Sequence, residues 1–194
     1  MKITLATGNK HKVEEINLIS SAYNIEFVLP EGEFDPIEDG KDFIENAYCK
    51  ALCASKTGNT ELYLADDSGL CVDSLNGAPG LMSARYAPTA DERIDKLLNA
   101  LKDFPEKKDR AAHFTCAMVI VNKKGEILYK IQKDCNGFIM HERKGEGGFG
   151  YDPIFFVTSE NKGMAQLAPE EKARVSHRAQ SLNCVIEWLR NYKA

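Results

Sequence analysis

The sequence predicts an α/β protein, because strand-like and helix-like segments alternate along its first third. Short apolar runs at 2–6, 25–29 and 62–67 have the length and residue types of strands. Between them, residues 9–21 and 42–57 keep apolar side chains at helical spacing. A β-rich hairpin later in the chain adds to the sheet content, so we expect a sheet covered by helices.

The rest of the chain is expected to hold the hairpin, short strands and three helices. The runs 112–121 and 126–134 flank Asn122-Lys123-Lys124-Gly125, which predicts a turn between two strands. The other expected elements are a helix at 91–102, short strands at 138–140 and 154–157, a short helix beginning near Pro169 and a last helix beginning after Ser176. No linker, repeat or low-complexity tract interrupts the sequence, so we interpret residues 1–194 as one domain.

The composition argues against a nucleic-acid or membrane partner. Apolar residues make up 43% and charged residues 28%, with a formal net charge of -4, so no basic excess exists to displace phosphate counterions. No apolar run approaches the ~18 residues of a membrane helix, and no targeting segment is visible. The six cysteines show no C-x-x-C spacing. We therefore expect a cytoplasmic protein with six reduced thiols.

Two adjacent carboxylates, Asp66 and Asp67, are predicted to lie at the tip of a buried strand. Because side chains alternate across a strand, Asp66 is expected on the face of Leu62 and Leu64, and Asp67 on the opposite face. Two neighbouring like charges invite a cation or a shared proton. A strand that ends in an ordinary Asp-Ser-Gly turn is the alternative that needs no function.

A candidate anion site lies at the start of the first predicted helix. The turn Thr7-Gly8-Asn9 precedes that helix, with Asn9 as its expected N-cap. The free N–H groups and the dipole of the helix attract negative charge. Lys10 and Lys12 oppose the dipole in the first turn, which fits best where a phosphate is bound. The spacing is not that of a P-loop, and a capped helix with two solvated lysines is the alternative. His177 and Arg178 begin the last helix in a similar way, with ordinary surface residues as the alternative.

Two segments, one glycine-rich at 145–153 and one acidic at 30–40, each allow a structural and a functional interpretation. The first satisfies G-x-G-x-x-G, but no helix follows it, so we reject a dinucleotide-binding role. Its Phe149 and Tyr151 are either anchors in the core or a stacking surface for a ligand ring. The acidic segment is either a solvated loop or the source of a carboxylate for a metal.

Seven motifs occur in order along the chain. They are Thr7-Gly8-Asn9-Lys10-His11-Lys12, Phe43-Ile44-Glu45-Asn46-Ala47, Ala65-Asp66-Asp67-Ser68-Gly69-Leu70, Gly77-Ala78-Pro79-Gly80, Ser83-Ala84-Arg85-Tyr86, Gly147-Gly148-Phe149-Gly150-Tyr151-Asp152-Pro153 and Ser176-His177-Arg178. In these motifs the chain resembles the inosine triphosphate pyrophosphatase family over nearly its whole length. Thr7 stands where many members have Ser and keeps the hydroxyl, and Ala179 stands where many have Gly and suits a helix.

The resemblance implies a fold, a reaction and a set of site residues. The fold is α/β, a long mixed β-sheet flanked by helices, with two lobes around a central active-site cleft, in a homodimer. The implied reaction is hydrolysis of ITP, dITP and XTP to the monophosphate and pyrophosphate with Mg²⁺. Asp67 is then the general base and a metal ligand, with Glu38 a second metal ligand. The implied substrate-binding residues are Thr7, Gly8, Asn9, Lys10, His11, Lys12, Ser68 and Lys172 for the triphosphate, and Phe149, Gly150, Tyr151, Asp152, His177 and Arg178 for the base.

The metal site has two further candidates, Glu45 and Asp66. Glu45 already has a structural explanation, because Asp42-Phe43-Ile44-Glu45 has the form of a capping box. Which acidic residue completes the site with Asp67 is therefore open.

Donor groups on His177 and Arg178 would favour purines that present an acceptor at O6. Adenine presents an amino group there, so a buried donor left unpaired would cost ~1–3 kcal/mol, and we expect ATP to be rejected by about 100-fold. Guanine also carries O6, so this argument does not exclude GTP. The alternatives are a pyrophosphatase for modified pyrimidine nucleotides, a non-catalytic nucleotide-binding module, and a phosphatase or kinase with Asp66 or Asp67 as a covalent centre.

Overall fold

The computed structural model describes residues 1–31 and 34–192, and strands and helices alternate in the first third of the chain as expected. The strands are β1 (Lys2–Leu5), β2 (Glu26–Val28), β3 (Leu62–Val72), β4 (Ala111–Asn122), β5 (Ile127–Ile139), β6 (Phe155–Val157) and β7 (Lys162–Gly163). The α-helices are α1 (Lys10–Ser20), α2 (Phe43–Thr57), α3 (Ala90–Ala100), α4 (Pro169–Val175) and α5 (His177–Asn191). Short 3₁₀-helices span Asp73–Leu75, Gly80–Arg85, Lys107–Arg110, Asp152–Ile154 and Met164–Gln166.

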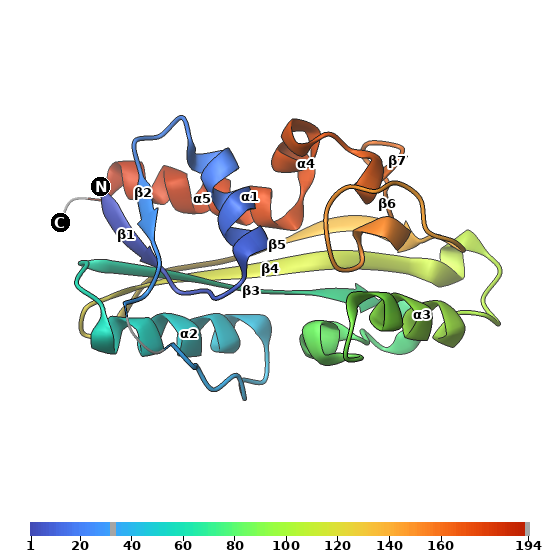
Figure 1. Cartoon of the computed structure of the whole chain (residues 1–194), viewed down its shortest axis with the longest axis horizontal. Coiled ribbons are helices and arrows are strands. Elements are labelled where there is room, and N and C mark those ends of the chain that lie inside the picture. Colours follow the sequence, from blue (N-terminus) through green and yellow to red (C-terminus); the bar gives the residue numbers. More distant parts are fainter. Residues whose placement is uncertain (32–33, 193–194) are drawn as a thin grey trace. The chain divides into compact units, whose positions relative to one another are not determined.

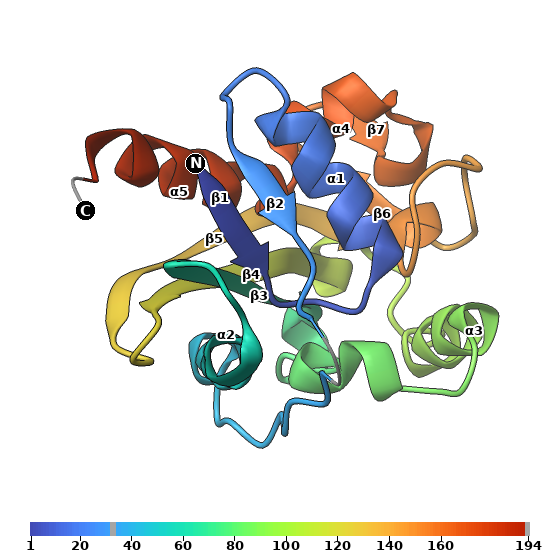
Figure 2. The ribbon, with the colours of Figure 1, turned by 60° about the vertical axis from the view of Figure 1, so that its left-hand side comes forward.

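The strands form one mixed sheet in the order β2-β1-β3-β4-β5-β6-β7 (Figure 1). β1 pairs in parallel with both β2 and β3, and Figure 2 shows β2 beside β1 at this edge. β6 pairs antiparallel with both β5 and β7. The expected mixed sheet with flanking helices is therefore confirmed. Within the described residues, no helix has both the length and the apolar character that crossing a membrane requires.

The chain divides into two compact units. Unit 1 consists of Met1–Asp67, Cys116–Lys133 and Arg178–Ala194, and unit 2 of Ser68–Thr115 and Asp134–His177. The division falls between Asp67 and Ser68 in β3 and between His177 and Arg178 in α5. Each of these two neighbouring pairs of predicted site residues is therefore shared between the units.

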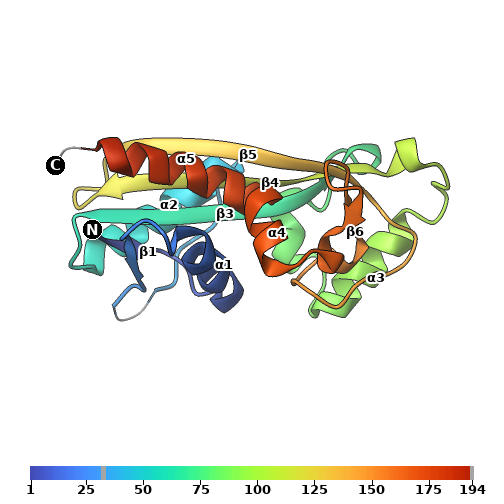
Figure 3. The same cartoon turned by 90° about the horizontal axis from the view of Figure 1, so that it is seen from above.

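In unit 1, helices cover both faces of the sheet. α1 and α5 lie on one face and α2 lies on the other (Figures 1 and 3). Leu62 and Leu64 pack in a core cluster with apolar residues of α1 and α5. Tyr63 and Ala65 pack in another cluster, with the small alanines of α2. The alternation predicted along β3 is thus confirmed, and it decides which helices each carboxylate can reach.

Unit 2 has a core cluster of its own. It includes Leu70 and Val72 of β3, Ile94 and Leu97 of α3, and the β6 residue Phe155. α3 begins at a capping box in which Thr89 accepts a hydrogen bond from the Glu92 backbone and the Glu92 side chain bonds back. The helix predicted at 91–102 is therefore confirmed with ends shifted by one or two residues.

β3 continues past the point where the sequence suggested that it ends. The strand runs to Val72, so Asp66 and Asp67 lie in its middle and not at its tip. Ser68 and Gly69 are typical turn residues, but Leu70 and Val72 beyond them are fully buried. Burial of these side chains outweighs the weak local preference for a turn. The prediction of carboxylates at a strand tip was wrong.

β5 is also one strand where two were predicted. It extends from Ile127 to Ile139 without the break expected between 134 and 138. Gly137, which lies between the two predicted strands, pairs with Val157 of β6. A Cβ atom at this position would lie 2.0 Å from the carbonyl oxygen of Phe156. Glycine is thus needed for the close approach of β6, and not for a turn.

Candidate active site

Asp67 faces α2, where two polar side chains hold its carboxylate. Lys50 Nζ lies 2.6 Å from Oδ1, and Asn46 Nδ2 donates to Oδ2 at 3.2 Å. Asn46 and Lys50 are four residues apart on the buried face of α2, which brings both to the same stretch of β3. These two donors restrain the carboxylate, and Asp67 is 7% exposed, so it still reaches the surface.

Glu38 lies close to the same ammonium group. Its Oε1 is 3.4 Å from Lys50 Nζ, so Lys50 is within ion-pair distance of both predicted metal ligands. Gly40, two residues further on, donates its backbone N–H to Asn46 Oδ1 at 2.8 Å. A Cβ atom on Gly40 would lie 2.8 Å from the backbone N and Oδ1 of Asn46. Asn46 thus ties the segment that carries Glu38 to Asp67.

The charges around Asp67 shift two pKa values. Burial raises the pKa of the Asp67 carboxyl above its usual value, and the ammonium of Lys50 opposes this only in part. Burial alone would lower the pKa of Lys50, but the carboxylates of Asp67 and Asp66 outweigh it and raise that pKa. Lys50 therefore stays a cation, while Asp67 is a carboxylate with more affinity for a proton than an exposed one.

Asp66 points to the other face of the sheet and is enclosed by cations. It is 1% exposed, and its Oδ2 lies 2.9 Å from Lys12 Nζ and 3.2 Å from Arg178 Nη2. A second guanidinium nitrogen of Arg178 contacts Glu15 of α1. Burial alone would raise the pKa of Asp66, but Lys12, Arg178 and Lys50 outweigh it and hold the pKa well below its usual value. Asp66 is therefore a permanently charged anchor.

The start of α1 has the expected cap. Asn9 Oδ1 accepts from the backbone N–H of His11 at 3.0 Å and of Lys12 at 3.4 Å, which confirms Asn9 as the N-cap. Thr7 is buried and accepts from the N–H of Asn9 at 3.2 Å. The side chain of Lys10 is exposed, as is that of His11, which lies 3.7 Å from Glu14. The first turn holds no acidic residue, so it remains a cationic helix start.

In unit 2, Asp152 is the centre of the glycine-rich segment. Its Oδ2 accepts from the N–H of Phe149 at 2.8 Å and from Lys172 Nζ at 2.7 Å. The Lys172 ammonium lies 4.8 Å from the centre of the Phe149 ring. Gly148 has φ +73, and a Cβ there would lie 2.1 Å from Asp152 Oδ2. Glycine is required at this position for both reasons, and the segment is held in one conformation.

The two aromatic residues of this segment have different roles. Tyr151 is 4% exposed and its hydroxyl donates to the Ser83 carbonyl at 3.0 Å, so its side chain is an anchor in the core. Phe149 is half-buried, with one face next to Lys172. His177 is buried, and its ring stacks on Phe114 with centroids 4.8 Å apart. A stacking surface for a ligand ring is thus available from Phe149 and not from Tyr151.

The structure gathers some predicted site residues and separates others by unit. Thr7 to Lys12, Glu38, Asp67 and Arg178 belong to unit 1, whereas Ser68, Phe149 to Asp152, Lys172 and His177 belong to unit 2. Ser68 is a half-buried residue of β3, and Gly150 has a positive φ of 63. Lys172, which was predicted to hold the triphosphate, is paired with Asp152 beside Phe149.

Two alternatives for the metal site lose support. Glu45 is exposed, and its Oε2 accepts from the N–H of Lys41 at 2.7 Å, in keeping with its structural explanation. Asp66 lies on the face of β3 opposite to Asp67 and is enclosed by Lys12 and Arg178. In the described part of the chain, no group of three His, Cys, Asp or Glu side chains is placed to bind a metal. Glu38 and Asp67 remain the candidate pair of metal ligands predicted from the sequence.

Sequence reasoning missed Lys50, Asn46 and Glu15. A signal for the first two was present, because they share a helical face with Phe43, Ala47 and Ala54, which is otherwise apolar. A lysine on such a face needs a buried carboxylate opposite it. Glu15 gave no such signal, since its partner Arg178 is 163 residues away in sequence.

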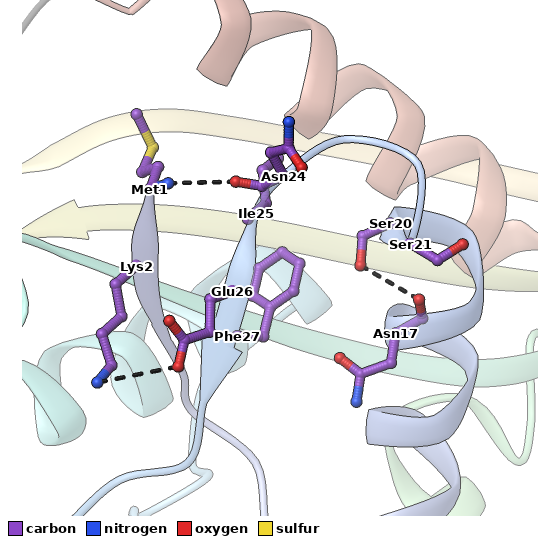
Figure 4. A pocket seen from close by; sticks show the side chains of 9 residues that line it. All are labelled: Met1, Lys2, Asn17, Ser20, Ser21, Asn24, Ile25, Glu26 and Phe27. Carbon is purple, nitrogen blue, oxygen red and sulfur yellow. Dashed lines mark hydrogen bonds and ion pairs between the residues drawn. The ribbon is translucent and has the colours of Figure 1, made fainter.

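One hollow of unit 1 lies away from these residues. It has a volume of about 620 Å³ and is lined by Met1, Lys2, Asn17, Ser20, Ser21, Asn24, Ile25, Glu26 and Phe27 (Figure 4). The amino group of Met1 donates to the Asn24 carbonyl, and Lys2 pairs with Glu26 across it. None of its nine lining residues is a predicted site residue.

Comparisons with known proteins agree along the whole chain. The model of the Ham1 family matches residues 3–188. A dITP/XTP pyrophosphatase of Treponema denticola is 43% identical over 197 residues, covering 98% of this chain and 99% of the relative. A solved HAM1 protein from Coxiella burnetii has a TM-score of 0.85 at 37% identity and covers 99% of this chain and 100% of its own. The Ham1 protein of Staphylococcus aureus also has a TM-score of 0.85, at 36% identity with both chains covered completely.

Proposed function

Because the chain belongs to the Ham1 family, we propose that it hydrolyses ITP, dITP and XTP to the monophosphate and pyrophosphate. The resemblance inferred from the seven sequence motifs is confirmed by the family match and by relatives named dITP/XTP pyrophosphatase. The reaction removes deaminated purines from the nucleotide pool. The observation that carries the proposal is Asp67, a nearly buried carboxylate with a raised pKa that Lys50 and Asn46 hold in place.

Asp67 is the general base of the proposed reaction. It takes a proton from the water that attacks a phosphorus atom of the substrate. A general base works best when its pKa is near the working pH, and burial shifts the pKa of Asp67 in that direction. Lys50 holds one carboxylate oxygen and Asn46 the other, so the side chain meets the water in one orientation.

The residues around Asp67 fit a magnesium ion. Magnesium prefers oxygen ligands and is usually held by one or two carboxylates together with substrate phosphates. Glu38 and Asp67 supply two such oxygens, both within 3.4 Å of one cationic nitrogen, Lys50 Nζ, so a positive charge is accommodated next to both. When bound, Mg²⁺ would neutralise phosphate charge and make the nearby water more acidic. Glu38 and Asp67 would hold the ion.

The substrate is divided between the two sets of residues. The triphosphate is bound by the α1 start, Thr7 to Lys12, where N–H groups and lysines attract anions, and by Ser68 and Lys172. The base is bound by Phe149 to Asp152, His177 and Arg178, with the half-buried ring of Phe149 as the stacking surface. Donors that match O6 of hypoxanthine and xanthine would be left facing the amino group of adenine, which favours ITP and XTP over ATP.

The protein is further proposed to be a cytoplasmic homodimer of one two-lobed pyrophosphatase domain, without a nucleic-acid partner. The net charge of -4 supports the last point. Among the rival functions, a covalent centre at Asp66 is disfavoured, because that carboxylate is 1% exposed and contacts two cations. A pyrophosphatase for modified pyrimidine nucleotides and a binding module without catalysis stay as the alternatives.

A substrate panel tests the proposal. ITP, XTP, GTP, ATP and a modified pyrimidine triphosphate are incubated side by side with enzyme and Mg²⁺, and the products are separated. We expect inosine and xanthosine monophosphates with pyrophosphate, and turnover of ATP lower by about 100-fold. Faster turnover of the pyrimidine substrate would support the first alternative. Binding of ITP without release of pyrophosphate would support the second.

A further inference from the structure

One carboxylate oxygen of Asp66 forms ion pairs with cationic side chains from the first turns of two helices. Oδ2 lies 2.9 Å from Lys12 Nζ in the first turn of α1. The same oxygen lies 3.2 Å from Nη2 and 3.4 Å from Nε of Arg178, in the first turn of α5. All three residues belong to unit 1. A carboxylate on the middle of β3 thus links α1 and α5 at the ends where a cation is least expected.

Each of these cations is unfavourable where it stands unless an anion compensates it. The first turns of α1 and α5 contain no acidic residue, and the helix dipole there opposes a positive side chain. A carboxylate with 1% exposure is costly unless it is paired and hydrogen-bonded. Asp66, Lys12 and Arg178 therefore stabilise one another, and the position of one constrains the positions of the other two.

Glu15 is a second carboxylate partner of Arg178, so the two cations of Asp66 have different surroundings. Its carboxylate contacts Nη1 of Arg178 from α1, and its side chain is 18% exposed. Arg178 is thus held from two sides, by Glu15 and by Asp66, whereas Lys12 forms an ion pair with Asp66. A substitution of Glu15 changes the surroundings of Arg178 and leaves the pair of Lys12 with Asp66 in place.

We propose that Asp66 is a positioning residue of the reaction, which holds Lys12 for the triphosphate and Arg178 for the base through one carboxylate oxygen. The inference rests on the proposed function. Because Lys12 and Arg178 share Oδ2, a change in the position of one changes the position of the other. Binding of the triphosphate is therefore coupled to recognition of the base. If Asp66 only stabilised the fold, its substitution would change neither triphosphate binding nor base recognition in the folded protein.

The first test uses Lys12→Gln, because Arg178 still pairs with the buried Asp66 carboxylate in this variant. The ratio of kcat/KM for ITP to that for ATP is measured in the wild type and in the variant. We expect this ratio to fall by about threefold or more. Lys12 belongs to the phosphate end, but without it Arg178 is the only one of the two cations left on Asp66 Oδ2, so the position of Arg178 changes. A ratio equal to that of the wild type would overturn the proposal.

The second test compares Asp66→Asn with Glu15→Gln, using inorganic tripolyphosphate as an inhibitor that has no base. Asp66→Asn is expected to raise KM for ITP and the inhibition constant of tripolyphosphate by about tenfold or more. Glu15→Gln is expected to change the ITP/ATP ratio and, because Arg178 shares Oδ2 with Lys12, to raise the tripolyphosphate constant by less than Asp66→Asn does. Asp95→Asn, which removes an exposed carboxylate from an ion pair with Arg143 in unit 2, is the control.

The outcomes separate positioning from stability. If Asp66→Asn lowers the melting temperature and the amount of active enzyme but leaves KM, the tripolyphosphate constant and the ITP/ATP ratio unchanged, Asp66 is structural only and the proposal is wrong. If Asp66→Asn yields no folded protein, the Lys12→Gln ratio decides. A wild type that releases no pyrophosphate from ITP contradicts the proposed function instead, and calorimetric titration of tripolyphosphate into wild type and Asp66→Asn then decides the role of Asp66 without turnover.

Discussion

Asp66 and Asp67 are neighbours in β3, yet their carboxylates lie on opposite faces of the sheet and have opposite electrostatic surroundings. Asp66 contacts Lys12 and Arg178, and its pKa lies well below the usual value. Asp67 contacts Lys50, and burial raises its pKa. Two carboxylates with pKa values driven apart are suited to two tasks. One stays charged and holds other residues, and the other can exchange a proton.

Asp67→Asn should abolish most of the turnover and keep the fold. The amide has the shape of the carboxylate and keeps one acceptor for Lys50 or Asn46, but it cannot accept the proton of the attacking water. We expect kcat for ITP to fall by about a hundred- to ten-thousandfold, with little change in the thermal unfolding midpoint. Steady-state kinetics and circular dichroism give the two values. Near-normal kcat in a folded variant would exclude Asp67 as the base.

Glu38→Gln should weaken the response to magnesium. Among the described residues, Glu38 and Asp67 are the carboxylates within ion-pair distance of Lys50 Nζ, so loss of one charge lowers the affinity for the ion. We expect the Mg²⁺ concentration for half-maximal activity to rise by about tenfold or more. EDTA should stop the wild-type reaction and added Mg²⁺ should restore it.

Asp39→Asn is the matched control for this experiment, because Asp39 is an exposed acid in the same segment. Its magnesium dependence should equal that of the wild type. Equal shifts in both variants would mean that the segment acts through its net charge and not through Glu38. Activity that persists in EDTA would exclude a metal requirement.

Arg178→Ala should affect both stability and the choice of base. Its guanidinium is 1% exposed and contacts Asp66 and Glu15, so removal leaves two carboxylates without this cation. We expect the free energy of unfolding to fall by about 3–5 kcal/mol, and the ITP/ATP ratio of kcat/KM to fall in the protein that remains folded. Urea titration measures the first quantity. An unchanged ratio would leave Arg178 a structural residue only.

Arg110→Met should destabilise the protein without changing its kinetics. Arg110 is 2% exposed and donates to the carbonyls of Leu101, Phe104, Ile139 and Met140. Without these donors, several buried carbonyls lose their hydrogen bonds to Arg110. We expect the free energy of unfolding to fall by about 3 kcal/mol or more. Because all five residues belong to unit 2 and none is a predicted site residue, kcat/KM of the folded protein should be unchanged. A stability equal to that of the wild type would contradict the role assigned to these hydrogen bonds.

Two of the six free cysteines should resist alkylation in the native protein. Cys116 is fully buried and burial raises its pKa to about 12, whereas burial raises the pKa of Cys135 to about 11. The reactive thiolate is therefore scarce at pH 8, and access is blocked as well. Mass spectrometry after maleimide treatment at pH 8 should find both unmodified until urea is added. Rapid native labelling of Cys116 would contradict the burial.

Local sequence patterns were sufficient for most elements of the fold. The cap at Asn9 and the alternation of β3 depend on residues within a few positions, so the sequence contains the whole signal. Predictions failed where a distant segment decides the conformation. The break predicted between 134 and 138 is absent, because Gly137 lets β6 approach β5 closely there. The continuation of β3 to Val72 likewise depends on a core that local pattern does not reveal.

The candidate site was predictable in part for the same reason. Asp67 and the start of α1 were found from short motifs, and the resemblance added Glu38. Lys50 carried a weak local signal, as a lysine on an apolar helical face. The link from Asp66 to Arg178 joins residues 112 positions apart, and only the folded chain reveals it. Roles that depend on pairing between distant charges were therefore beyond the sequence.

The most direct measurement for the central claim is ³¹P NMR of the products formed from ITP in water enriched in ¹⁸O. Hydrolysis between the α- and β-phosphates predicts IMP and pyrophosphate in equal amounts. The ¹⁸O appears in the IMP if water attacks the α-phosphorus and in the pyrophosphate if it attacks the β-phosphorus. Asp67→Asn should form neither product. Release of IDP and inorganic phosphate, or pyrophosphate release that Asp67→Asn leaves unchanged, would contradict the account.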